Sequence, residues 1–244
     1  KRLRITKTLI VGLSAAALII VTCILYVRRY RQATTFANGE YTVRGVDLSH
    51  HNPIIDWTKI DESQNIRFVY LKATEGLSHN DRNYISNYKA AKASGLKTGS
   101  YHFYLFAVSG KKQARHFIRT AKCASGDLLP AIDVEHSPGN PHSKDTAYIN
   151  LVVKELKTLE NELYEYYGIH PVIYTNKQCY GLYVKANFAD NPLWICDLNS
   201  EPLGVDNWII WQFSHKGKLP GINEKIDLNY FRYSFDQLDK ILIP

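Results

Sequence analysis

The sequence predicts an α/β fold: a TIM-like (β/α) barrel of eight strands with fewer than eight helices, preceded by a single N-terminal transmembrane helix. Two observations predict the barrel. Short apolar runs alternate with helical patterns over 43–244, and most connections after residue 198 are too short for full helices. The alternative is an open doubly wound sheet, but no glycine-rich phosphate loop follows the first run. A third observation, an uncharged N-terminal segment, predicts the transmembrane helix.

The N-terminal segment at 8–27 contains no charged side chain. Twenty helical residues span about 30 Å, which matches the hydrocarbon core of a bilayer. Arg28 and Arg29 follow the run, which is typical of a stop rather than of a cleavage site. We therefore expect a basic-flanked anchor at 1–31 and a short polar tether at 32–42. A cleaved signal peptide and a buried helix are the alternatives.

Eight runs rich in apolar, β-branched and aromatic residues predict the strands. They lie at 42–49, 66–74, 97–106, 128–135, 170–175, 192–198, 207–214 and 224–231. Several are continuously apolar, as expected for parallel strands that are buried on both faces. Helical patterns lie at 56–64, 80–94, 109–123, 143–167, 176–187 and 234–242. The strongest is 143–167, which Ser143 can cap and Gly168 can end.

The charge distribution argues against a nucleic-acid partner. The chain has a formal net charge of +7, but residues 1–32 hold seven basic side chains and no acidic one. The remainder has 23 basic and 23 acidic residues and is formally neutral, so a basic binding surface is not predicted.

The cysteines do not predict a zinc finger or a redox motif, because none of them forms a CxxC pair. Cys23 lies in the apolar run. One disulfide among Cys123, Cys179 and Cys196 stays open.

Carboxylates stand at the ends of the predicted strands, where the active site of a (β/α) barrel lies. They are Asp47, Asp133, Glu135 and Asp227, with Asp197 as a weaker candidate. Asp133 and Glu135 are two residues apart on one strand, so their side chains share a face. Two carboxyl groups this close raise the pKa of one of them, and glycosidic cleavage needs a protonated carboxylic acid. The simpler reading is that each acid is a cap or part of a loop ion pair.

Aromatic side chains cluster in the same strands. They are Tyr70, Tyr101, Phe103, Tyr104, Tyr174, Trp194 and Trp211. Sugar rings stack on such side chains, so a carbohydrate groove is predicted, although about half of strand aromatics are core residues.

A metal site is the alternative near these acids, because His50, His51, His102 and His136 lie beside them. The chain has no HExxH or GxSxG motif and no ligand register, so we expect neither a metal nor a cofactor. The other histidines, including His215, are interpreted as surface or loop residues.

Several motifs occur in order along the domain. They are DLSHHNP (47–53), VYLKATEG (69–76), GSYHFY (99–104), AIDVE (131–135), PLWI (192–195), IIWQFS (209–214) and IDLNYF (226–231). Through them, residues 43–244 resemble glycoside hydrolase family 25, the Chalaropsis-type lysozymes. The resemblance implies a catalytic domain with an eight-stranded barrel. It also implies cleavage of the β-1,4 bond between N-acetylmuramic acid and N-acetylglucosamine in peptidoglycan.

Carried over to this sequence, the resemblance implies that Glu135 is the general acid and Asp133 its partner, with Asp47 and Asp227 as the other acids of the site. The predicted substrate-binding residues are Tyr70, Lys72, Tyr101, Tyr174 and Trp194. Cys196 departs from the family pattern, in which a small residue is common at this place. The long loop after Glu135 is a second departure.

The spacing of the two acids leaves the mechanism open. Two residues of strand separate the Cα atoms of Asp133 and Glu135 by about 6.6 Å, which fits neither a retaining nor an inverting route better. A substrate-assisted route is our hypothesis, in which Asp133 orients the acetamide of the sugar.

The implied partner is the glycan strand of peptidoglycan, and we expect a monomer that binds no nucleic acid. The anchor at 8–27 would place the catalytic domain on the extracytoplasmic side of a membrane. A wall-binding module without activity and a metal-dependent hydrolase or deacetylase are the alternative functions.

Overall fold

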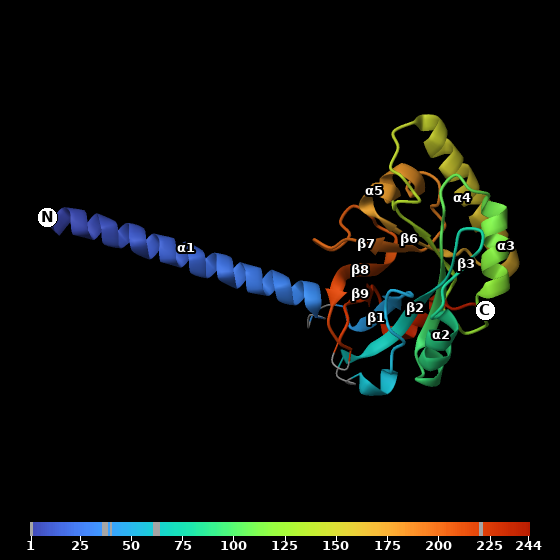
Figure 1. Cartoon of the computed structure of the whole chain (residues 1–244), viewed down its shortest axis with the longest axis horizontal. Coiled ribbons are helices and arrows are strands. Elements are labelled where there is room, and N and C mark those ends of the chain that lie inside the picture. The colour runs from blue at the N-terminus through green and yellow to red at the C-terminus, as the bar shows by residue number, and fades with distance from the viewer. Residues whose placement is uncertain (1, 36–38, 40, 61–63, 220–221) are drawn as a thin grey trace.

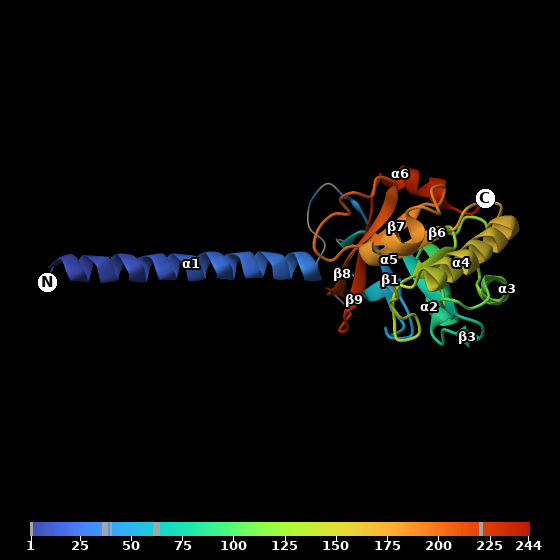
Figure 2. The same ribbon diagram turned by 90° about the horizontal axis from the view of Figure 1, so that it is seen from above.

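The computed structural model describes residues 2–35, 39, 41–60, 64–219 and 222–244; within 2–35, side chains are described at 11, 13–28, 30 and 35. A long helix, α1 (Arg2–Thr34), extends away from a rounded domain, and its C-terminal end lies beside β8 (Figures 1 and 2). The helix runs into the segment predicted as a tether. Residues 36–38 and 40 of that segment lie outside the described residues.

The prediction of a transmembrane helix at 8–27 is wrong on the described residues. In this part of the chain, no helix is both long and apolar enough to cross a membrane. Residues 8–10 and 12 of the predicted span lie outside the described side chains. The same finding contradicts the single-pass membrane localisation that the sequence predicted.

Eight strands form a closed ring, as predicted. They are β1 (Val43–Leu48), β2 (Ile66–Glu75), β4 (Lys97–Phe103), β5 (Ala131–Val134), β6 (Val172–Asn176), β7 (Leu193–Cys196), β8 (Trp208–Gly217) and β9 (Ile226–Phe231). The sheet order is β1-β9-β8-β7-β6-β5-β4-β2, and pairing of β1 with β2 closes it. The short β3 (His79–Asn80) pairs with the end of β2, beyond the reach of β1. All eight predicted strands are confirmed.

The last strand departs from a fully parallel barrel. β9 is antiparallel to both of its neighbours, β8 and β1, whereas the other neighbours in the ring are parallel. The connection from β8 is short, and a parallel crossover needs a dozen or more residues. As a result, Asp227 lies near the N-terminal end of its strand. That end of β9 lies on the same rim of the barrel as the C-terminal ends of the parallel strands.

The three longer helices of the barrel domain lie along one side of the ring, as Figure 1 shows; they are α2 (Tyr84–Ala93), α3 (Gly110–Thr120) and α4 (Thr146–Tyr167). Two short helices, α5 (Lys177–Cys179) and α6 (Phe235–Leu238), follow in the chain. Asp145, rather than Ser143, caps α4, because its side chain accepts a hydrogen bond from the Ala147 N–H. Gly168 ends that helix in the left-handed conformation, as predicted.

The remaining helical patterns form shorter turns than predicted. At 56–64, the described residues contain the single 3₁₀ turn η1 (Trp57–Lys59), and residues 61–63 lie outside the described part. At 176–187, α5 continues into the π-helical turn η3 (Tyr180–Val184). At 234–242, α6 passes into the 3₁₀ turn η4 (Asp239–Ile241).

Two apolar layers cover the two faces of the strands. Alternate residues such as Ile132 and Val134 face the helices and pack with Leu156 and Leu159 of α4. Residues in the other register fill the interior of the barrel; they include Phe68, Tyr70, Ala131, Val172, Trp194 and Phe231. This alternation turns Asp133, in register with Ala131, toward the interior.

The four cysteines are free thiols, so the disulfide that the sequence left open is absent from the described residues.

Candidate active site

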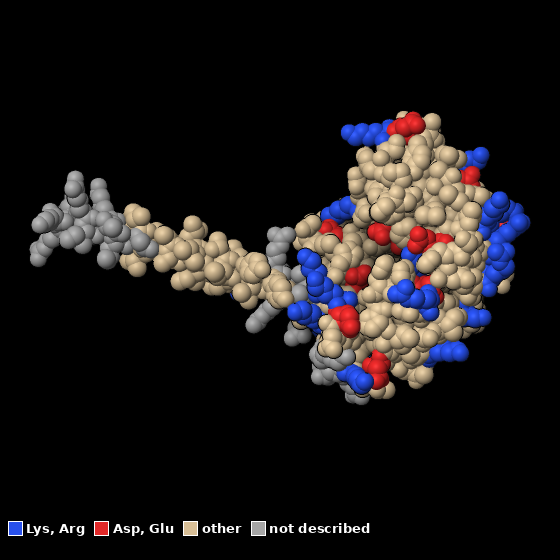
Figure 3. All heavy atoms as spheres, viewed as in Figure 1, with Lys and Arg blue, Asp and Glu red and all other residues tan. Residues whose placement is uncertain are grey.

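A pocket of about 230 Å³ opens at the rim where the parallel strands end and β9 begins. It is lined by Asp47, Ser49, His51, Lys72, Tyr101, Phe103, Asp133, Glu135, Tyr174, Trp194, Gln212, His215 and Asp227. Figure 3 shows acidic side chains gathered in the middle of this face of the domain. All four predicted acids therefore meet in one pocket, although as many as 180 residues separate them in the sequence.

Asp133 and Glu135 come from the end of β5. The residue between them, Val134, packs outward in the core, so both carboxyl groups face the pocket. Burial, followed by repulsion from Glu135, raises the pKa of Asp133 well above its usual range. Burial also raises the pKa of Glu135, and Asp227 adds to that rise while His215 and Lys72 oppose it. The pair therefore favours protonated carboxylic acid, the form that can donate a proton to a leaving group.

The Oδ1 atom of Asp133 is buried and has no hydrogen-bond partner among the described residues. A buried polar atom without a partner is costly in free energy. This oxygen is therefore available to a group that enters the pocket.

Asp47 is held from two sides by amides. Its Oδ1 accepts hydrogen bonds from Asn229 Nδ2 at 2.7 Å and from Gln212 Nε2 at 2.9 Å. Each amide is held in turn, because Tyr174 donates to Gln212 Oε1 and Trp194 donates to Asn229 Oδ1. Two pocket aromatics are thus connected to one carboxyl group through a continuous network.

Asp47 and Asp227 are directly opposite each other in the β1–β9 pair. Like charges in that position repel. Burial, followed by Asp227, raises the pKa of Asp47 to about 8 against the opposing effect of the two amides. Asp227 has a cationic partner of its own, because its Oδ1 lies 3.1 Å from His215 Nδ1. That contact is the main cause that raises the pKa of His215 to about 11.

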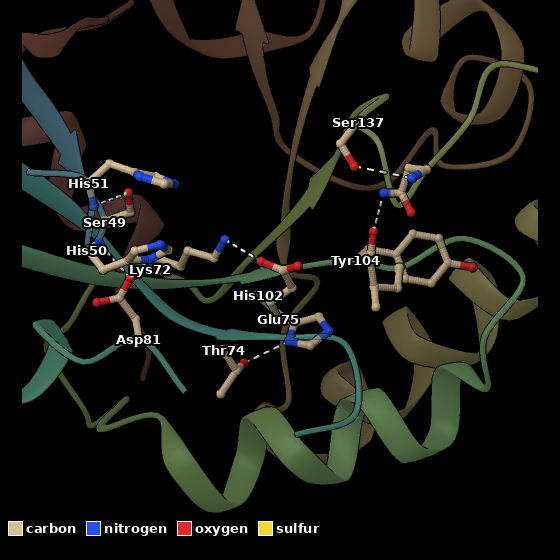
Figure 4. A network of polar contacts seen from close by, with 12 residues as sticks. Ser49, His50, His51, Lys72, Thr74, Glu75, Asp81, His102, Tyr104 and Ser137 are labelled. Carbon is tan, nitrogen blue, oxygen red and sulfur yellow. Dashed lines mark hydrogen bonds and ion pairs between the residues drawn. The ribbon is translucent and has the colours of Figure 1, made fainter. Parts of the chain in front are cut away.

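A second cluster of polar side chains lies beside β2 at the border of the pocket, and Figure 4 shows its contacts. Lys72 Nζ lies 2.7 Å from Glu75 Oε2 and 4.6 Å from the centre of the Phe103 ring. His50 Nδ1 lies 2.9 Å from Asp81 Oδ2, and the neighbouring His51 lines the pocket. Desolvation and the nearby His50 and Lys72 lower the pKa of His51, which favours its neutral form.

Four of the five predicted substrate-binding residues line the pocket. Tyr101, Tyr174 and Trp194 form its aromatic wall, and Lys72 is the fourth. The structure does not bring Tyr70 to the lining. Its ring is fully buried in the barrel interior, 4.8 Å from that of Trp194, and its hydroxyl donates to the Leu129 carbonyl. Glycine at position 99 leaves room for the Tyr70 ring, because a Cβ atom there would lie 2.4 Å from that ring.

Sequence reasoning missed several residues of the site. Gln212 and Asn229 are polar positions inside apolar strands, and Asn229 is two residues after Asp227, so the alternation of strand faces could have found it. His215 was interpreted as a surface or loop residue, but it lines the pocket and pairs with Asp227. Ser49 also belongs to the lining.

A metal centre has no support in the part of the chain that the structure describes, where no group of three or more His, Cys, Asp or Glu side chains is arranged to hold an ion.

Comparisons with known proteins agree with this geometry. The family model described as glycosyl hydrolases family 25 matches residues 46–222. The chain is similar to the N,O-diacetylmuramidase of Chalaropsis sp, with 30% identity over 82% of this chain and 99% of the relative. It is also similar to lysozyme M1 of Streptomyces globisporus, with 30% identity over 80% of this chain and 70% of that protein. A solved family 25 glycosyl hydrolase from Bacillus anthracis matches with a TM-score of 0.76 and 32% identity, over 85% of this chain and 96% of that one.

Proposed function

The chain belongs to glycosyl hydrolases family 25, and on that premise we propose that this glycosidase is a lysozyme-type muramidase. It cleaves the β-1,4 bond between N-acetylmuramic acid and N-acetylglucosamine in peptidoglycan. The similarity to a diacetylmuramidase and to a lysozyme supports this substrate. It favours neither a silent wall-binding module nor a metal-dependent hydrolase or deacetylase.

The single observation that carries the proposal is the pair of carboxyl groups at the end of β5. Asp133 and Glu135 face one pocket, and burial raises the pKa of both. A glycosidase needs one carboxylic acid that stays protonated near neutral pH and a second carboxyl group close to it.

We assign the general-acid role to Glu135, which is the more accessible of the two at the pocket rim. It protonates the oxygen of the leaving sugar as the glycosidic bond breaks, and it then takes a proton from the attacking water. Asp133 orients the substrate through its Oδ1, which has no partner among the described side chains.

The remaining carboxyl groups hold the site. Asp47, fixed by Gln212 and Asn229, fixes the position of the aromatic wall, and the Asp227–His215 pair sets the charge opposite Glu135. Lys72, Tyr101, Tyr174 and Trp194 contact the sugar.

The acetamide of the substrate completes the reaction in this proposal. Its oxygen attacks the anomeric carbon while Asp133 holds its N–H, and water opens the resulting ring with overall retention of configuration. NMR of the first-formed anomer tests this route. Retention together with a requirement for the 2-acetamido group supports it, and clean inversion would rule it out.

The function is tested with the full chain on purified peptidoglycan, with products identified by mass spectrometry. We expect new reducing ends on N-acetylmuramic acid and no effect of a chelator. Glu135→Gln removes the proton donor, and the rate falls by about 10³-fold because general acid catalysis contributes about 10²–10⁴.

The matched control is Glu165→Gln, the same chemical change at an exposed position on α4, which keeps the full rate. If the unaltered chain binds the wall without cleaving it, or if Glu135→Gln cleaves it normally, the proposal fails.

A further inference from the structure

Cys196 contacts His215, which in turn contacts Asp227. Its Sγ lies 3.5 Å from His215 Nε2, and the other ring nitrogen of His215 lies 3.1 Å from Asp227 Oδ1. The three side chains come from the end of β7, the end of β8 and the beginning of β9. A thiol beside an imidazole that a carboxylate orients is the arrangement that activates a cysteine nucleophile.

His215 carries a positive charge in this arrangement. Its contact with Asp227, followed by that with Cys196, raises the pKa of His215 to about 11, so the ring is an imidazolium near neutral pH. Its Nδ1–H then donates to the Asp227 carboxylate, and its Nε2–H points at the sulfur. The sulfur therefore lies beside a cation, the setting in which reactive cysteines are found.

Cys196 adjoins residues that line the pocket. Cys196 is two residues beyond Trp194 on β7, so both side chains lie on the same face of the strand. Its neighbour in the β7–β8 register is Gln212, another residue of the lining. Cys196 also packs against the apolar cluster that contains Tyr174 and Trp194.

The other cysteines show what is particular to Cys196. Cys179 also contacts an imidazole, at 3.4 Å from His136 Nδ1, but it is fully buried, and burial raises its pKa to about 12. Cys23 is exposed on α1, and no histidine occurs before His50 in the sequence. Cys196 combines an imidazole contact with partial exposure.

We propose that Cys196 is a thiol modification site at the rim of the pocket, which small disulfide compounds convert to a mixed disulfide that obstructs sugar binding. The Cys196 sulfur attacks one sulfur of the compound, a new S–S bond forms and the original S–S bond breaks. The leaving thiolate carries away the electron pair and takes a proton from solvent. Cys196 is oxidised and the released half is reduced, and an added free thiol reverses the exchange.

The experiment treats the full chain with 2-hydroxyethyl disulfide, a small uncharged probe, and follows adducts by peptide mass spectrometry. We expect Cys196 to react at least about tenfold faster than the exposed Cys23, because reactive cysteines occupy electropositive, partly exposed surroundings such as those His215 provides. His215→Gln removes the cation and slows the reaction at Cys196 by about tenfold, while the rate at Cys23 stays the same. Equal rates at the two cysteines would overturn the proposal.

The second arm measures glycosidase activity on peptidoglycan before and after the adduct forms. We expect the activity to fall in proportion to adduct at Cys196 and to return after dithiothreitol. Cys196→Ala keeps its activity in the presence of the probe, whereas the control Cys23→Ala loses it as the unaltered chain does. Full activity of the completely modified chain would refute the obstruction. The adduct rates require no peptidoglycan cleavage, so they separate this proposal from the proposed function.

Discussion

Asp47 and Asp133, on two sides of the pocket, are almost equally buried but differ in their hydrogen bonds. Asp47, which is 7% exposed, has both amide donors on one oxygen, whereas Asp133, which is 6% exposed, has an oxygen without a partner among the described residues. The β1–β9 side therefore satisfies its acid internally, and the β5 side leaves its acid ready for a substrate. Burial alone does not decide which carboxyl group can do chemistry; the hydrogen bonds that remain available decide it.

The largest effect is expected on the β5 side. Asp133→Asn keeps the shape of the side chain but removes the carboxyl group that faces the substrate. We expect kcat/KM on peptidoglycan to fall by about 10²-fold, as for the loss of one positioned polar group at a reacting centre. Reducing-sugar release measures it, and wall-binding assays check that the variant still binds. A decrease of less than about threefold would contradict the assigned role.

The protonation of Asp47 makes the free energy of unfolding depend on pH. The folded-state pKa of Asp47, about 8, lies above its ordinary value of 3.8, so the native chain keeps a proton that the unfolded chain has lost. The free energy of unfolding therefore falls as the pH rises from about 4 to about 8. Asp133 and Glu135 shift in the same direction.

Asp47→Asn makes this decrease shallower, by at most about 4 kcal/mol between pH 5 and pH 8, because each pH unit inside the shifted range contributes about 1.4 kcal/mol. Urea unfolding at pH 5 and pH 8 measures it. If the variant and the unaltered chain lose the same stability between these two pH values, Asp47 is not the group that carries the proton.

A smaller effect follows from Asn229→Ala, which removes one donor to Asp47 and the acceptor for Trp194. We expect a loss of about 1–3 kcal/mol in stability, because buried partners are left unsatisfied. Activity falls as the aromatic wall loosens. Thermal unfolding and kcat/KM are compared with Asn187→Ala, whose amide donates to the Tyr183 carbonyl outside the pocket. Equal losses in the two variants would show that the network has no particular role.

The smallest effect is expected at Tyr70, which the structure places below the pocket. Tyr70→Phe keeps the ring that packs over Gly99 and removes one hydrogen bond to Leu129. Stability should fall by about 1 kcal/mol, and the KM for peptidoglycan should change less than twofold. A large rise in KM with unchanged stability would instead show that Tyr70 contacts the substrate, as the sequence predicted.

Much of the fold was predictable because each strand carries its own local signal. Runs rich in apolar, β-branched and aromatic residues marked all eight strands, and the two-residue spacing of Asp133 and Glu135 predicted a shared face. The direction of β9 was not predictable in this way, since strand patterns read the same in both directions. The family resemblance assigned Tyr70 to the groove, whereas the structure buries its side chain in the barrel interior outside the pocket lining. Strand alternation assigns a residue to the interior but does not give its depth below the rim.

The sequence by itself determined what depends on neighbours along the chain: the eight strands, the end of α4 at Gly168 and the acid pair on β5. Only the tertiary structure decided which distant residues meet. Closure of the ring brings Asp47 opposite Asp227, and the reversal of β9 places His215 between Asp227 and Cys196. The reason is that local periodicity constrains the face of each element, whereas contacts between elements depend on their register and direction in the closed sheet.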